Sequence, residues 1–252
     1  MRTILQIELA EISLIGDRGE NQDRVLIATG EDCALLICID GMGGHADGAK
    51  AAEVASQTIA QAFSRVSQPL IDPQGFMHLA IGKAHNNLVA LGSEQSMDSR
   101  PRATCAICLV QDGAAYWAHV GDSRLYLVRG AAVKERTRDH SHVELLLREG
   151  LIDETEIADH PMRNYVECCL GGDARLPGMT ITGQKRLLPG DTLLACTDGM
   201  WSGLEDDSIA ALGDAQAKLP AALRQLAEAA VRVCGPYADN TSAVALRMLN
   251  PV

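Results

Sequence analysis

The chain has 252 residues, of which 47% are hydrophobic and only 3% aromatic, and its formal net charge at pH 7 is −11. This length and hydrophobic content allow a substantial core of aliphatic side chains. The acidic balance argues against a nucleic-acid or membrane-surface partner, since both kinds of binding need a basic face. No apolar run in the sequence approaches the roughly 20 residues that span a bilayer.

The eight cysteines mostly lie inside apolar runs, as small buried hydrophobic residues do. Cys105 and Cys108 have CxxC spacing, but they fall in a predicted strand and no second such pair follows, so they do not indicate a zinc site. Glu8 and Glu11 interrupt any signal-peptide core near the N-terminus. Free thiols without an export signal predict a cytoplasmic protein.

The first part of the chain combines predicted strands with two long helices. Strands are expected over residues 3–15, 25–28 and 33–39, and helices over residues 47–66 and 74–91. A polar loop lies between the first two strands. A hairpin between the second and third strands would bring Asp23 and Asp40 close together.

The second part of the chain is richer in strands. Short turns separate the predicted strands 103–110, 114–120 and 124–128, which indicates an antiparallel meander. The remaining expected elements are a strand at 132–135, a helix at 140–149, an irregular segment at 151–173, strands at 179–186 and 191–196, a helix at 220–233 and a strand at 241–249. Long helices among antiparallel strands predict an α+β fold with the helices outside, and no linker or repeat divides the sequence into more than one domain.

Several aspartates occupy comparable places at the ends of predicted strands. Two of them follow an apolar strand and precede glycine, two lie at strand edges, and one lies in the turn Gly-Asp-Ser-Arg; they are Asp40 and Asp198, Asp23 and Asp239, and Asp122. Converging carboxylates repel one another unless a cation lies between them. An all-oxygen ligand set without a His/Cys cluster favours Mg²⁺ or Mn²⁺ over Zn²⁺.

Such a site would suit phosphate chemistry. Two divalent ions about 3.5–4 Å apart can activate a water molecule for in-line attack on phosphorus. Arg18 supplies a planar cation for phosphate oxygens, and it lies in the same loop as Asp23. The combination of five carboxylates with Arg18 favours a metal site over a set of unrelated turns.

Taken singly, these positions also have structural interpretations. An Asp-Gly pair after a strand is an ordinary turn, and the turn around Asp122 is ordinary hairpin chemistry. Asp47 suits the N-cap of a helix, and His119 suits a hydrogen-bonded histidine of a sheet. The glycines at 41–44 do not form a nucleotide-binding P-loop, because no Gly-Lys-Ser/Thr follows them.

Seven segments, in this order, resemble the protein phosphatase 2C family, the metal-dependent serine/threonine phosphatases, in its compact bacterial form: GDRGENQD, IDGMGGHADG, VGDSRLYLVR, DHS, HPMRN, LACTDGMW and DNTS. The resemblance covers about residues 16–249. It implies two stacked antiparallel β-sheets flanked by helix pairs, in a single catalytic domain over residues 1–252. It also implies a mobile flap at about 141–173 that touches protein substrates.

The resemblance implies roles for the metal ligands. Asp40 would bridge two ions, and the carbonyl of Gly41 would bind one of them. Asp198 and Asp239 would complete the shell of the first ion. Asp23 would hold the shell of the second, in part through water.

Further implied roles, and departures from the family pattern, concern other positions. Arg18 would bind the substrate phosphate, and Asp122 would contribute to a third, weaker ion. Some family members place a histidine directly after the Asp-Gly pair, where this chain has Met42. His45, three residues on, is the bacterial arrangement, and it is either a catalytic acid or a helix-entry residue. Glu167, near the end of the flap, stands where a more neutral residue is commoner.

The implied activity is that of a hydrolase in bacterial signalling, a manganese- or magnesium-dependent protein serine/threonine phosphatase. Its expected partners are proteins phosphorylated by a Ser/Thr kinase, and the expected oligomeric state is a monomer. Two alternatives remain open. One is a binding module that keeps the fold without turnover, although no ligand position is lost. The other is a phosphatase for small phosphorylated metabolites, against which the retained flap argues.

Overall fold

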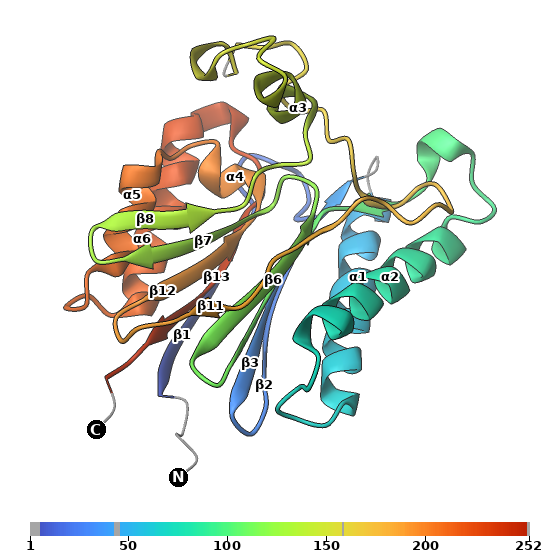
Figure 1. Ribbon diagram of the computed structural model, residues 1–252. Coiled ribbons are helices and arrows are strands. Elements are labelled where there is room, and N and C mark those ends of the chain that lie inside the picture. The colour runs from blue at the N-terminus through green and yellow to red at the C-terminus, as the bar shows by residue number, and fades with distance from the viewer. Residues whose placement is uncertain (1–5, 43–45, 158, 251–252) are drawn as a thin grey trace.

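The structure, a computed structural model, describes residues 6–42, 46–157 and 159–250. Two antiparallel β-sheets lie face to face, and helices cover the outer face of each sheet (Figure 1). The predicted α+β sandwich is confirmed. Among the described residues, none of the helices combines the length and the apolar character that a membrane crossing requires.

The smaller sheet has five strands, in the order β1 (Ile7–Leu14), β13 (Thr241–Met248), β12 (Thr192–Cys196), β7 (Arg124–Arg129) and β8 (Ala132–Arg136). The larger sheet has eight. Its main path is β10 (Thr180–Ile181), β6 (Ala114–Val120), β5 (Cys105–Gln111), β3 (Cys33–Met42), β4 (Arg102–Ala103) and β9 (Leu170–Gly171). Beside this path, β2 (Asp23–Thr29) pairs with β3, and β11 (Lys185–Arg186) pairs with β6.

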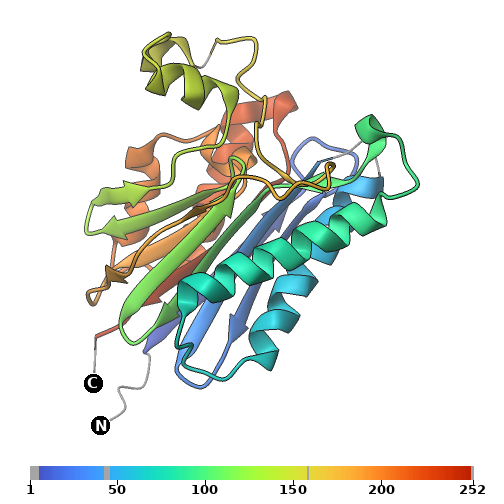
Figure 2. The ribbon, with the colours of Figure 1, turned by 45° about the vertical axis from the view of Figure 1, so that its right-hand side comes forward.

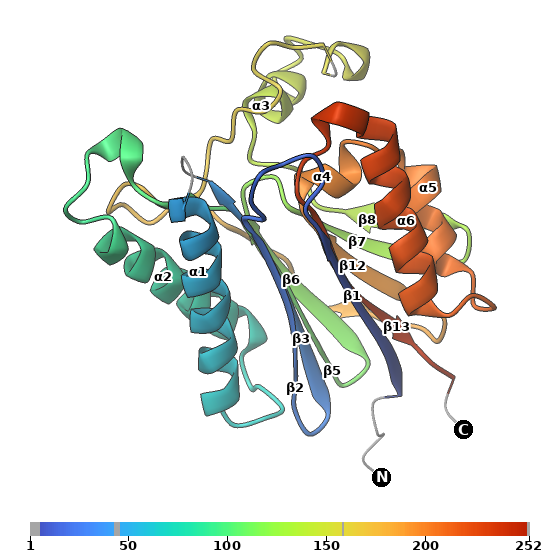
Figure 3. The same cartoon turned by 180° about the vertical axis from the view of Figure 1, so that it is seen from behind.

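Helices α1 (Ala46–Arg65) and α2 (Pro73–Leu91) pack on the larger sheet, as Figure 2 shows. The smaller sheet is covered by α6 (Leu219–Cys234) together with the short helices α4 (Asp198–Trp201) and α5 (Asp206–Ala210), seen from behind in Figure 3. Helix α3 (His142–Arg148) stands apart, above the sandwich. Short 3-10 turns at Met97–Ser99, Glu154–Glu156, Ala211–Gly213 and Gly235–Tyr237 complete the helical structure.

Strand β3 explains why its sequence is an uninterrupted apolar run. Leu35, Ile37 and Ile39 point into the core between the larger sheet and the helices. Leu36 and Cys38, at alternate positions, point into the core between the two sheets. A strand buried on both faces has no solvent side to mark with polar residues, so the usual alternation is lost.

The predicted meander is wrong at one turn. Strand β6 belongs to the larger sheet and β7 to the smaller, so residues 121–123 cross between the sheets and do not close a hairpin. Gly121 adopts φ +97°, which glycine tolerates best. The hydroxyls of Ser123 and Thr104 lie 2.6 Å apart in the buried crossing. Asp122 is thereby carried into the interior, and a plain hairpin role for it is excluded.

Other predicted boundaries shift. The strand predicted over 33–39 continues to Met42, because Gly41 and Met42 pair with β4. Thr104 separates β4 from β5, and the strand predicted over 179–186 is reduced to β10 and β11. Asp47 lies inside the first turn of α1, so it is not the cap that precedes the helix. Helix α5 has no counterpart among the predicted elements.

Candidate metal centre

The first two carboxylates of the site meet on neighbouring strands. Asp23 on β2 is the direct pairing partner of Asp40 on β3, so the predicted hairpin is confirmed. Asp23 is buried, and its carboxylate accepts a hydrogen bond of 2.8 Å from Oγ1 of Thr197. Burial raises the pKa of Asp23 to about 7, and the charge of Asp239 adds to this, while hydrogen bonds from Ser242 and Thr197 oppose it.

The charges of the other four predicted aspartates all act on Asp40. Burial raises the pKa of Asp40 well above its ordinary value, and the charges of Asp23, Asp198, Asp122 and Asp239 raise it further. Burial also raises the pKa of Asp198 far above normal, with Asp122, Asp239 and Asp23 adding to it. Because such interactions weaken with distance, the five side chains form one group, which we call the acidic cluster.

Asp122 contributes an unusual feature to the cluster. Its Oδ1 is buried and has no hydrogen-bond partner within the described residues. Burial and the nearby charge of Asp139 raise the pKa of Asp122 to about 6, and Arg124 opposes the shift. A buried carboxylate oxygen without a donor is costly. A bound cation would supply the missing partner, so this observation fits a metal site.

The all-oxygen donor set suits Mg²⁺ or Mn²⁺. Nevertheless, no group of three or more His, Cys, Asp or Glu side chains in the described ranges is arranged to hold a metal ion as it stands. The carboxylates are thus close enough for their charges to interact, but those described are not positioned as a complete set of ligands around one ion. His45 lies outside the described residues, so neither of its two interpretations is tested.

Gly41 is required by a close approach of two elements. A Cβ at this position would lie 2.0 Å from the carbonyl oxygen of Gly48 on α1 and 2.8 Å from that of Gln22. The Gly41 N–H donates to the Gln22 carbonyl at 3.1 Å. The end of β3 therefore passes between α1 and the loop that carries Arg18, and only glycine fits there.

Arg18 lies at the solvent side of the acidic cluster. Its Nη2 is 2.5 Å from Oδ2 of Asp239, and the two side chains are 58% and 35% exposed. An ion pair this exposed contributes only about 0–1 kcal/mol. Arg18 could therefore leave the Asp239 carboxylate for a phosphate group at a small cost in free energy, as its predicted role requires.

Asn240 organises the Arg18 loop, although it is not among the predicted site residues. Its side chain is buried, accepts from the Gln22 N–H at 2.8 Å and donates to the carbonyls of Ile15 at 2.8 Å and Glu20 at 3.0 Å. It therefore holds both ends of the loop beside Asp239. The available signal is an amide residue directly after a predicted ligand, the kind of side chain that can satisfy several backbone groups at once.

The same loop provides a test of how firmly Asp239 is held. Gly16 has φ +65°, and a Cβ there would lie 2.3 Å from the carbonyl oxygen of Asp239. Gly16→Ala is therefore expected to lower the free energy of unfolding by at least about 2 kcal/mol, since left-handed strain alone costs about 1–2 kcal/mol. Urea unfolding measures this loss, and Mn²⁺ titration should show weaker binding.

Gly130→Ala is the matched control, because Gly130 has φ +59° but no neighbouring atom within 4 Å of the position that a Cβ would take. It should show the conformational strain without any change in Mn²⁺ binding. Equal losses of stability and equal Mn²⁺ binding in the two variants would contradict a special role for the contact between Gly16 and Asp239.

Of the segment 141–173, here called the flap, residues 141–157 and 159–167 rise above the sandwich (Figures 1 and 2), whereas Leu170–Gly171 join the larger sheet as β9. The raised part is closed at its root, where Ser141 bridges to Val166 and the Glu167 N–H donates to the His140 carbonyl at 2.8 Å. Glu167, the departure from the family pattern, also lies 2.7 Å from the ring of His142.

A cavity of about 590 Å³ lies beneath α3, and its lining includes His119, Asp139 and Met179 but none of the acidic cluster. His119 is buried, and its Nε2 lies 2.8 Å from the carbonyl oxygen of Arg138. This agrees with its predicted role as a sheet histidine. The cavity at the flap root and the acidic cluster are thus distinct sites. The crossing at residues 121–123 connects them, because it carries Asp122 and its Gly121 carbonyl accepts from His140.

Comparison with known proteins bears on the identity of this fold and site. The family model described as Protein phosphatase 2C matches residues 13–233. The serine/threonine protein phosphatase PstP of Mycobacterium tuberculosis is 31% identical over 210 residues, which cover 80% of this chain and 39% of that protein. The chain thus spans well under two thirds of the length of this curated relative.

Two solved structures extend the likeness to the fold. The serine/threonine phosphatase of S. agalactiae superposes with a TM-score of 0.88 at 27% identity and covers 96% of this chain and 100% of that one. The catalytic domain of PstP, in complex with two manganese ions, superposes with a TM-score of 0.81 at 26% identity and covers 97% and 99%. With a family model that spans most of its length and structural neighbours that share its whole architecture, the chain belongs to the protein phosphatase 2C family.

Proposed function

We propose that this protein is a metal-dependent protein serine/threonine phosphatase that hydrolyses phosphoserine and phosphothreonine. The observation that carries the proposal is the acidic cluster, in which four carboxylates raise the pKa of Asp40 and Arg18 lies at the exposed rim. The two manganese ions in the PstP catalytic domain, a protein of the same fold, support a divalent metal here as well.

In this proposal, Asp40, Asp198 and Asp239 would hold one ion, and Asp40 and Asp23 would hold a second. The Gly41 carbonyl would bind one of the two. Oδ1 of Asp122, which has no hydrogen-bond partner among the described residues, would contribute to a third. When bound, the Mn²⁺ or Mg²⁺ pair supplies Lewis-acid stabilisation and lowers the pKa of an attacking water. The carboxylates of the chain would keep the ions in place, and their combined negative charge would attract cations, which relieve the repulsion between them.

Arg18 has a separate role, which is to bind and orient the phosphate group. Its present partner is the carboxylate of Asp239 at 2.5 Å, and two phosphate oxygens would match the planar guanidinium equally well. Orientation of the phosphorus for in-line attack contributes to the rate because it removes the entropic cost of alignment.

The substrate class and the setting are also parts of the proposal. The flap would bind proteins that a Ser/Thr kinase has phosphorylated. The protein would act as a monomer with one catalytic domain. The eight cysteines are all free, which supports a reducing cytoplasmic setting. The formal charge of −11 remains an argument against nucleic-acid and membrane partners.

The test is an assay of the purified chain with Mn²⁺ on phosphothreonine peptides, p-nitrophenyl phosphate and sugar phosphates. We expect Mn²⁺-dependent phosphate release from the first two, and its loss in EDTA and in Asp198→Asn. Hydrolysis of sugar phosphates alone would replace the protein substrate class by metabolites. Tight phosphopeptide binding in calorimetry without release would indicate a binding module, and an unchanged Asp198→Asn variant would refute the assigned site.

A further inference from the structure

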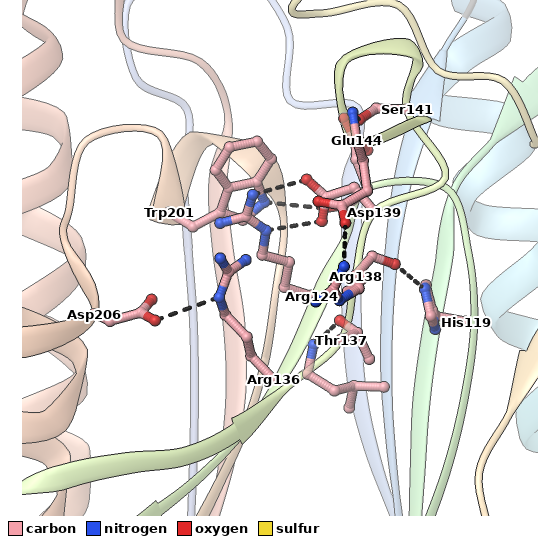
Figure 4. A network of polar contacts seen from close by, with 12 residues as sticks. His119, Arg124, Arg136, Thr137, Arg138, Asp139, Ser141, Glu144, Trp201 and Asp206 are labelled. Atoms are coloured by element: carbon pink, nitrogen blue, oxygen red, sulfur yellow. Dashed lines mark hydrogen bonds and ion pairs between the residues drawn. The ribbon is translucent and has the colours of Figure 1, made fainter. Parts of the chain in front are cut away.

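One largely covered guanidinium joins three segments that are distant in the sequence. Arg124, the first residue of β7, forms a bidentate ion pair with Asp139, with Nε–Oδ1 and Nη2–Oδ2 distances of 2.8 Å and 2.7 Å (Figure 4). The side chains are only 16% and 7% exposed. Bidentate pairs of this kind combine strength with a defined geometry. Because the two carboxylate oxygens of Asp139 already accept from its Nε and Nη2, we do not assign Arg124 as a second phosphate ligand.

Asp139 binds the edge of the guanidinium, and Trp201 covers one of its faces (Figure 4). The Cζ atom of Arg124 lies 3.5 Å from the centroid of the indole ring. The Nε1–H of Trp201 donates to the backbone carbonyl of Asp122 at 3.0 Å. Trp201 ends α4, the helix that begins at Asp198. The indole therefore links the backbone of one cluster member to the helix that carries another.

The partner of Arg124 belongs to the root of the flap. Asp139 directly precedes His140, whose N–H donates to the Gly121 carbonyl at 2.9 Å and whose own carbonyl accepts from the Glu167 N–H at 2.8 Å. One side of the flap root thus meets the crossing that carries Asp122, and the other side is joined to it through His140. Through Asp139, Arg124 connects this root to Trp201 and α4.

We propose that Arg124 and Trp201 are positioning residues that align Asp122 with Asp198 and couple the acidic cluster to the root of the flap. The inference rests on the proposed function, in which the cluster binds Mn²⁺. The Asp122 Oδ1 has no partner in the described part of the chain, so a cation there would act on the crossing. Arg124 follows the crossing directly, two residues after Asp122, so a shift of the crossing on cation binding would reach Asp139 through the ion pair.

Coupling of this kind is reciprocal. If Mn²⁺ orders the flap root, then loosening the connection must weaken Mn²⁺ binding by the same free energy. A pair that only stabilises the fold would change the unfolding midpoint without changing either response. The two possibilities can therefore be separated by experiment.

The decisive variant is Trp201→Phe, which keeps an aromatic ring over Arg124 but removes the N–H that binds the Asp122 carbonyl. Losing this hydrogen bond is expected to weaken Mn²⁺ binding about three- to tenfold in calorimetry. In hydrogen exchange, Mn²⁺ should slow the amides of residues 139–142 and 165–167 in the wild type, and it should do so less in the variant. Arg124→Lys, which keeps the charge but loses the fork, should show the same two losses.

The second tryptophan of the chain offers a matched control. Trp117 is buried, and its Nε1 has no hydrogen-bond partner among the described residues. Trp117→Phe therefore makes the same chemical change in a ring that lines the cavity beside Asp139 but has no N–H hydrogen bond to lose among the described residues. We expect it to alter the unfolding midpoint while leaving Mn²⁺ affinity and the exchange response of the flap root at their wild-type values.

The outcomes separate the two proposals. If the wild type binds Mn²⁺ while Trp201→Phe and Arg124→Lys match it in affinity and in flap response, the coupling is refuted and the proposed function stands. A wild type that binds no Mn²⁺ refutes the metal-dependent function, and the coupling with it. Should Trp201→Phe fail to fold, Arg124→Lys carries the same comparison.

Discussion

Replacing Asp40 by asparagine is expected to lower kcat for phosphopeptide hydrolysis by at least about 10³-fold, the equivalent of several kcal/mol of transition-state stabilisation. Asp40 is the member of the acidic cluster on which the four other carboxylates act, and it is the proposed bridge between two ions. An amide keeps the shape of the side chain but removes the charge that attracts the cations. Steady-state kinetics with saturating Mn²⁺ measures the loss.

The same variant should be more stable than the wild type when metal is absent. Because the pKa of Asp40 is raised in the folded protein by burial and then by its neighbours, ionising it near neutral pH opposes folding. Removing the charge relieves this cost, so urea unfolding in EDTA should show a gain of about 1 kcal/mol or more. Lost activity together with gained stability separates a metal ligand from a residue that simply supports the fold.

Asp112→Asn is the control for Asp40→Asn. Asp112 is exposed in the turn between β5 and β6 and has φ +51°, a conformation that asparagine also tolerates. Neither kcat nor stability in EDTA should change in this variant. If Asp40→Asn retained more than about a tenth of the wild-type activity, the effect would fall below that of a single transition-state hydrogen-bond donor, and Asp40 could not be the bridging ligand.

Without metal, the protein is expected to lose stability as the pH rises. Burial is the main reason why the pKa of Asp23 is raised to about 7 and that of Asp122 to about 6. A carboxyl whose pKa is higher in the folded state binds more protons there, so stability is greatest below its ordinary pKa and falls as the pH approaches the raised value. The sensitive window therefore runs from near pH 4 to near pH 7.

The expected effect is large enough for calorimetry. Each unit of raised pKa corresponds to about 1.4 kcal/mol, and about 1 kcal/mol shifts the Tm of a domain of this size by about 2–4 °C. We expect the Tm in EDTA to fall by at least about 5 °C between about pH 5.5 and about pH 8. With Mn²⁺ the trend should reverse, because metal binding requires the deprotonated carboxylates.

Asp23→Asn tests the assignment of this pH dependence, since it removes the group whose pKa lies near 7. The fall of Tm in EDTA should be smaller in Asp23→Asn and unaltered in Asp112→Asn. A Tm that stays level or rises with pH in the metal-free wild type would show that folding does not raise the pKa values of these carboxyl groups.

Local patterns were sufficient for much of the fold and for the outline of the site. The turn between β2 and β3 predicted the pairing of Asp23 with Asp40, because a short link with turn residues between two apolar runs favours a hairpin. The same rule failed at Gly121-Asp122-Ser123, where the link is equally short. Whether such a link closes or crosses depends on how two sheets pack, which neighbouring residues do not encode.

Long-range partners were the other part that could not be predicted. Arg124 meets Asp139 across 15 residues, and Trp201 meets Asp122 across 79. Asn240 holds a loop more than 200 residues away. No periodicity or residue spacing in the sequence predicts such contacts, since each one forms only when the sheets pack together. The predicted ligands were recognisable because they stand at strand ends, whereas the residues that position them do not share such a mark.

The placement of the acidic cluster has a consequence for folding kinetics. Asp23 and Asp40 come from the larger sheet, Asp198 and Asp239 adjoin strands of the smaller, and Asp122 lies on the crossing between them. The cluster is thus a seam that exists only when the two halves of the sandwich have docked, and docking brings like charges together. A cation at the seam acts on a late event, so it should slow unfolding more than it accelerates folding. Metal supply would then govern how long each molecule survives as well as how fast it works.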